Sequence, residues 1–126
     1  MNTKIALFLV LLLFASCEGN SYHQIKGGEF TVNYSDQGIT EQATELAKYW
    51  KENDLIVEGK QDIALFFNDG IWIVKLIAND PKEELTFEER KLFIELENDL
   101  SERVFNGNPV SIQISNKKFE TIYEIS

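Results

Sequence analysis

The side chains that most often carry nucleophilic chemistry are scarce in this sequence. Its 126 residues include one cysteine, Cys17, and one histidine, His23. A catalytic triad needs a serine, cysteine or threonine beside a general base, which a third group orients. His23 lies in residues 18–28, a stretch without apolar periodicity that ends in a glycine pair and is typical of a tether. No motif pairs a serine with a lysine, so we predict no catalytic residue.

Metal and phosphate sites are not indicated either. Cysteine and histidine do not occur in pairs, and the carboxylates do not follow the spacing of a calcium loop. The acidic run that could loosely hold a divalent cation comprises Asp80, Glu83, Glu84, Glu88 and Glu89. Acids at the entrance of a helix are explained more simply by the positive end of the helix dipole. Since Gly27-Gly28 also lacks the lysine of a phosphate loop, we expect no metal and no cofactor.

Carboxylates are plentiful, and they leave one enzymatic alternative open. Glycoside hydrolysis needs an acid and a base across a cleft. The 21 Asp and Glu residues fall in predicted turns or on exposed helix faces, where no cleft is indicated. A hydrolase that uses surface carboxylates is therefore the alternative to a non-enzymatic binding module, which is our first hypothesis.

The amino-terminal segment is typical of an export signal. Lys4 precedes ten apolar residues, 5–14, and Ala15-Ser16-Cys17 follows. Ten residues are too few to span a bilayer as a helix, which takes about 20, but they suit the hydrophobic region of a signal peptide. We predict that residues 1–16 are removed.

Residues 1–18 resemble the signal of bacterial lipoproteins, with Ala15 and Ser16 directly before the cysteine. The resemblance implies cleavage before Cys17, lipid on its thiol and attachment to the cell envelope. Phe14 departs from the leucine usual at that position, so ordinary secretion is the alternative. The resemblance also implies the outer rather than the inner membrane in a cell that has both, since Glu18 is not the aspartate that favours the inner membrane.

Charge narrows the choice of partners. Without residues 1–16 the chain carries 11 Lys and Arg against 21 Asp and Glu, a net charge of −10. Such a body is repelled by phosphate backbones and anionic headgroups, which excludes nucleic acid and disfavours electrostatic docking on a membrane. The remaining 110 residues suit one domain, 29–126, without a disulfide.

The pattern of this domain predicts β-α-β-β-α-β-β. A strand begins at Phe30, a helix with Thr40 as N-cap covers about 41–53, and a hairpin pairs 62–68 with 71–77 across Asp69-Gly70. A capping box at Thr86 opens the second helix, and two short strands around 110–114 and 119–123 end the chain. We predict an α+β two-layer sandwich with a ferredoxin-like antiparallel sheet of order 5-4-1-3-2. Right-handed crossovers then place both helices on one face; a different strand order is the alternative.

Alternation in the hairpin separates two faces. Phe67–Trp72, Leu65–Val74 and Ile63–Leu76 should pair toward the helices, and Phe66–Ile73 and Ala64–Lys75 away from them. The outward apolar residues are Phe66, Ile71, Ile73, Ile77 and Ile122. We predict this face as a contact surface for a protein partner or a homodimer. The alternative is a mixed surface whose large side chains only shield the strands.

From Glu29 onward the chain also resembles a family of small exported bacterial domains of uncharacterised function. The resemblance rests on a helix that ends in the segment Val-Phe-Asn-Gly-Asn-Pro-Val, residues 104–110. It implies the α+β fold and no particular activity.

Overall fold

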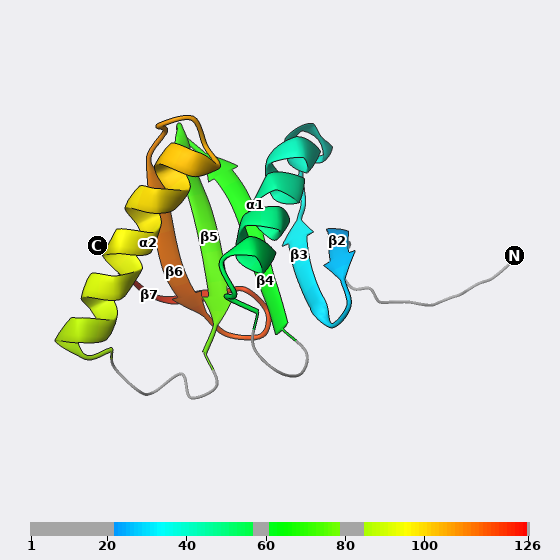
Figure 1. Cartoon of the computed structure of the whole chain (residues 1–126). Helices are drawn as coiled ribbons and strands as arrows, with labels where there is room; N and C mark the ends of the chain where they lie inside the picture. Colours follow the sequence, from blue (N-terminus) through cyan, green and yellow to red (C-terminus); the bar gives the residue numbers. More distant parts are fainter. Residues whose placement is uncertain (1–21, 57–60, 79–84, 126) are drawn as a thin grey trace, which may run out of the picture.

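A computed structural model describes residues 22–56, 61–78 and 85–125 of the chain (Figure 1). These residues form a mixed six-stranded sheet with two helices. In chain order the elements are β2 (His23–Gly27), β3 (Phe30–Tyr34), the 3-10 helix η1 (Gln37–Ile39), α1 (Thr40–Glu52), β4 (Gln61–Asn68), β5 (Ile71–Ile77), α2 (Phe87–Arg103), β6 (Val110–Ser115) and β7 (Thr121–Glu124). The predicted export signal, Cys17 and the acidic positions 80, 83 and 84 lie outside the described residues. No helix in the described ranges is both long and apolar enough to cross a membrane.

The order of the strands in the sheet follows the chain, β2-β3-β4-β5-β6-β7. The pairs β3/β4 and β5/β6 are parallel, and the other three pairs are antiparallel. The prediction of an α+β fold with two helices is confirmed, but the ferredoxin-like antiparallel sheet of order 5-4-1-3-2 is wrong. In the predicted order the strand at Phe30, which is β3, lies between β6 and β5. In the structure β3 pairs with β2 on one side and with β4 on the other.

Strand β2 corrects the interpretation of residues 18–28 as a tether. His23–Gly27 pairs along its whole length with β3, and Ile25 lies opposite Val32. Gly28 adopts a φ of 67° in the connecting turn, a conformation that glycine reaches without strain. An edge strand with only one inward apolar residue gives too weak an alternation to be identified from sequence.

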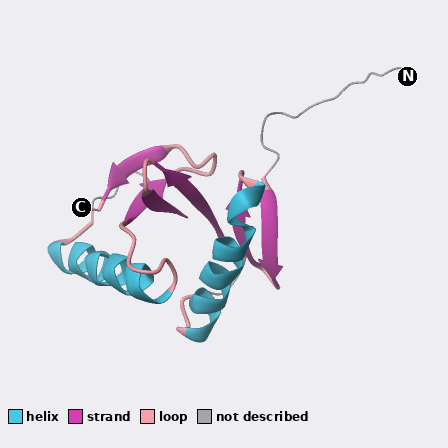
Figure 2. Cartoon of the chain, turned by 90° about the horizontal axis from the view of Figure 1, so that it is seen from above, coloured by secondary structure: helices cyan, strands magenta, loops and turns pink. Residues whose placement is uncertain are grey.

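Both helices cover the same face of the sheet, as predicted (Figure 2). Trp50 of α1 stacks on Phe30 of β3 with 6.2 Å between ring centroids, and Phe105, just after α2, stacks on Trp72 of β5 at 4.8 Å. The strands β3 and β4 point in one direction, and β5 and β6 point in the opposite direction. Both crossovers, β3 to β4 and β5 to β6, move toward the same edge of the sheet. Two right-handed crossovers would therefore put the helices on opposite faces, so one of the two crossovers is left-handed, against the usual preference.

The local turns form as predicted, with one exception. Asp69 and Gly70 have φ of 53° and 79°, and all hairpin pairs have the predicted register. Thr86 and Glu89 form both hydrogen bonds of the capping box. The assignment of Thr40 as an N-cap is wrong, because η1 precedes α1 directly. Asp36 caps that 3-10 helix by accepting from Gly38 N at 2.8 Å.

The core lies between the helices and the sheet. Its fully buried side chains come from both layers and include Val32, Leu46, Leu65, Val74, Leu100 and Ile112. One carboxylate is buried with them: Glu97 of α2 accepts a hydrogen bond from Ile112 N at 2.7 Å. This bond satisfies a backbone donor of β6 and ties α2 to the sheet.

Candidate functional site

The structure brings most of the predicted contact surface together on the sheet face that the helices leave uncovered, called here the outer face. Phe66 lies directly opposite Ile73, and Ile71 and Ile77 follow along the same side of β5. Ile122 belongs to β7, beside an irregular register with β6. Ile71 and Ile122 are 39% and 38% exposed, while the other three are half-buried.

Two aromatic side chains cover the middle of this face. Tyr22, directly before β2, meets Phe66 edge to face at 6.2 Å between ring centroids. It also meets Phe119, from the turn between β6 and β7, edge to face at 5.7 Å. Phe119 is only 9% exposed. The outer face therefore carries a small packed cluster and is not an open apolar surface.

Lys75 completes this cluster. Its Nζ donates to the backbone oxygen of Phe119 at 2.8 Å and lies 5.0 Å from the centroid of the Phe66 ring. The position over the ring gives a cation–π attraction. Burial lowers the pKa of Lys75 from its ordinary value, because the charged form loses hydration there. We define the outer cluster as Tyr22, Phe66, Lys75 and Phe119.

The polar side chain of Asn33 is buried in the row of residues that includes Lys75 of the outer cluster. Asn33 is 5% exposed; it donates to Ile63 O at 3.0 Å and accepts from the Gln24 side chain at 2.9 Å. Ala64, its neighbour in β4, is fully buried although it points away from the helices. Burial on both faces shows that these parts of β3 and β4 lie inside the domain.

Sequence patterns did not reveal the residues that cover the outer face. Tyr22 fell in the predicted tether, and Phe119 was placed at the start of a strand that begins only at Thr121. One signal was present: Asn116 accepts from the backbone N–H groups of Lys118 and Glu120 at 2.8 and 3.0 Å. Asparagine is typical of such a turn because its side chain can bond to the backbone two residues on, but this signal does not show that the turn folds back over the sheet.

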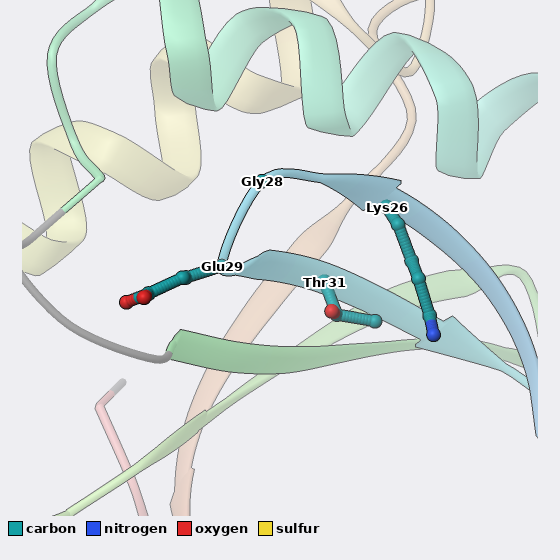
Figure 3. A pocket seen from close by; sticks show the side chains of 4 residues that line it. All are labelled: Lys26, Gly28, Glu29 and Thr31. Atoms are coloured by element: carbon teal, nitrogen blue, oxygen red, sulfur yellow. The ribbon is translucent and has the colours of Figure 1, made fainter.

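A shallow hollow lies at the β2–β3 hairpin, lined by Lys26, Gly28, Glu29 and Thr31 (Figure 3). Lys26 and Thr31 lie directly opposite each other on the two strands, and Glu29 points away from Lys26. The lining contains a single carboxylate, whereas acid–base hydrolysis of a glycoside needs two. The hollow has the residues for a weak polar contact and lacks those for this reaction.

A tyrosine with a raised pKa joins the two helices. Tyr49 of α1 donates a hydrogen bond to Asp99 of α2, and Arg103 Nε lies 2.8 Å from the same carboxylate. Burial, and next the bond to Asp99, raise the pKa of Tyr49 to about 12. A tyrosine held neutral by such a contact stabilises the packing of the helices and is not poised to exchange protons near neutral pH.

The described part of the chain contains no group of three or more His, Cys, Asp or Glu side chains that could hold a metal ion. Of the acidic run singled out above, Glu88 and Glu89 lie in the first turn of α2, and Glu89 is engaged in the capping box. Asp80, Glu83 and Glu84 lie outside the described residues.

Comparison with known proteins gives one match. A family model described as a family N-terminal domain matches residues 24–126. This range begins inside β2, so the match includes most of the edge strand. No curated protein and no solved structure matches the chain.

Proposed function

We propose a function for the whole chain, which over residues 24–126 belongs to the domain family described as a family N-terminal domain. The protein is a lipoprotein of the bacterial cell envelope, anchored through lipid on Cys17, and the domain acts by binding rather than by catalysis. In a cell with two membranes its place is the outer membrane.

The observation that carries the anchor is the position of Cys17. The apolar stretch 5–14 is followed by Ala15-Ser16-Cys17, and residues 18–21 separate this cysteine from Tyr22, which packs on Phe66 and Phe119. More than one acyl chain makes such an attachment stable, since each buried methylene contributes about 0.8 kcal/mol.

Binding is favoured over hydrolysis by what the ionisable side chains contact. Glu97 bonds to Ile112 N, Asp99 to Tyr49, Glu89 to the Thr86 backbone and Lys75 to Phe119 O. Each of these groups stabilises the fold at its own place, and they do not converge on a shared hollow. A hydrolase that uses surface carboxylates would need two of them across a cleft.

The anchor is tested by replacing the cysteine in the full chain. Cys17→Ser should abolish incorporation of radiolabelled palmitate and leave the precursor uncut, whereas Glu18→Gln should incorporate label like the unchanged chain. In a host with two membranes, Glu18→Asp should move the lipidated chain from the outer to the inner membrane, measured by membrane fractionation. Normal maturation of the Cys17→Ser chain would favour ordinary secretion instead.

A further inference from the structure

The contacts of Tyr22 set how far the domain can lie from its anchor. Tyr22 is held by Phe66 and Phe119 at ring-centroid distances of 6.2 and 5.7 Å. From Tyr22 back to Cys17 the chain takes five residue steps, which span at most about 18 Å when fully extended. The full stretch 18–28 would have reached about 36–40 Å. The outer face, where Tyr22 is packed, must therefore stay close to the anchored cysteine.

The turn between β6 and β7 lies beside the start of this short connection. Phe119 contacts the Tyr22 ring, and the two preceding residues, Lys117 and Lys118, are exposed. The Asn116 side chain orders the turn by accepting from Lys118 N and donating to the Glu120 carboxylate at 2.8 Å. The Glu120 carboxylate therefore accepts its hydrogen bond from the Asn116 side chain. The two lysines project from an ordered turn at the place where the connection leaves the domain.

Charge is distributed unevenly between the two layers. The helices α1 and α2 carry nine Asp and Glu residues against five Lys and Arg. The outward strand positions and the 116–120 turn carry four lysines against three carboxylates: Lys26, Lys75, Lys117 and Lys118 against Asp62, Glu120 and Glu124. The net charge of −10 therefore comes mainly from other parts of the chain than the face near the anchor.

We infer that the outer face lies against the bilayer, with Lys117 and Lys118 at the phospholipid phosphates and the Tyr22–Phe119 pair behind them. This inference rests on the proposed lipid on Cys17. Lysine side chains can rest their apolar stems on a surface while the ammonium reaches phosphate, and tyrosine suits the headgroup region because one end is apolar and the other polar. Attraction of lysines to anionic lipid adds to the anchor, as a second signal does in other lipidated proteins.

This placement changes the expected occupant of the outer face. The net charge of the whole chain disfavours electrostatic contact with a membrane, but a short connection presents one face only, and that face is not acidic. A protein partner or a second copy would have to reach Ile71 and Ile122 on the side of the domain that the connection holds nearest the lipid. The bilayer is present there from the moment the anchor inserts.

The test compares two exposed lysines on opposite layers. Lys117 lies in the turn over the outer face, and Lys48 lies on α1, away from the sheet. Lys117→Cys and Lys48→Cys each remove one positive charge and each supply the only free thiol once Cys17 is lipidated. The lipidated full chain is labelled with a nitroxide and placed in vesicles of phosphatidylethanolamine with some phosphatidylglycerol. A small share of the lipids carries a nickel chelate on the headgroup. Electron spin resonance then measures how strongly the nickel enhances the relaxation of the nitroxide, which reports how close the labelled position lies to the headgroups.

A several-fold larger relaxation at position 117 than at position 48 is the expected result. Equal values, or a larger value at position 48, would overturn the orientation while leaving the anchor intact. A chain that fails to sediment with the vesicles would reject the anchor itself and the inference with it. If sedimentation velocity shows that the vesicle-free, detergent-solubilised chain is a dimer which Ile71→Ser and Ile122→Ser dissociate, the face belongs to a second copy and the inference is wrong.

The contribution of charge is tested separately. Lys118→Glu in the chain labelled at position 117 should reduce the relaxation there severalfold, and Lys51→Glu on α1 should leave it unchanged. Omitting phosphatidylglycerol should act like Lys118→Glu. An unchanged signal in both cases would contradict recognition of anionic headgroups by this turn.

Discussion

The two faces of the sheet are covered in different ways. On the helix side, Val32, Leu65, Val74 and Ile112 are completely buried beneath α1 and α2. On the outer side, the cover consists of the outer cluster, in which Tyr22 comes from one end of the domain and Phe119 from a turn near the other. The difference shows that strand alternation tells which residues share a face and leaves open whether that face is covered.

The helices and the outer cluster should also differ in how much they contribute to the free energy of unfolding. The helix side buries many side chains in close packing, so the loss of one leaves a cavity that cannot collapse. The outer cluster has few members and includes a lysine, so its energy depends on the Tyr22–Phe119 contact. Substitutions on either side can measure this difference.

The largest effect is expected on the helix side. Leu65→Ala should lower the free energy of unfolding by about 2–5 kcal/mol, because the fully buried side chain is lost and a cavity remains. Phe67→Ala is the matched control: Phe67 lies two residues away on the same face but is 50% exposed, and its loss should cost roughly 1 kcal/mol. Denaturant unfolding measures both. A smaller cost for Leu65→Ala than for Phe67→Ala would contradict the burial described for β4.

An intermediate effect is expected in the outer cluster. Phe119→Ala should cost about 2–4 kcal/mol, since the ring is largely buried and packs against Tyr22. Alanine and phenylalanine are both strained at the φ of 62° that the backbone has at this position, so the change isolates the loss of the ring. Combined with Tyr22→Ala, it should show a coupling of about 0.5–1.5 kcal/mol. Lys118→Ala is the neutral control; strictly additive losses from Tyr22→Ala and Phe119→Ala would show that the two rings do not cover the face together.

The smallest effect is expected between the helices, and it depends on pH. Tyr49→Phe should cost about 1–2 kcal/mol, because Asp99 loses a hydrogen bond. The folded-state pKa of Tyr49 is raised from 10.0 to about 12, so the folded state holds the proton more tightly than the unfolded state. The advantage over Tyr49→Phe should be complete below pH 10.0 and decline as the pH rises toward about 12. Paired urea titrations of both chains would measure it, and a pH-independent difference would exclude this coupling.

Local features of the fold could be predicted because each depends on residues close in the chain. The Asp69-Gly70 hairpin and its register follow from a two-residue turn, and the Thr86 capping box follows from side chains three residues apart. Thr40 failed as an N-cap because a neighbouring residue, Asp36, caps the 3-10 helix first. The α+β class with two helices was predicted as well, because it follows from the periodicity of each segment.

By itself, the sequence determined both helices, the two faces of the β4–β5 hairpin and the absence of a pattern for nucleophilic or metal chemistry, but it did not reveal β2 or η1. Only the tertiary structure decided that β3 pairs with β2 and β4, and that Tyr22 and Phe119 meet over the outer face. The physical reason is the range of the contacts. Turns and caps are selected by the torsion angles and side chains of neighbouring residues, whereas strand order and the covering of a face depend on which distant segments bury surface together once the chain is compact.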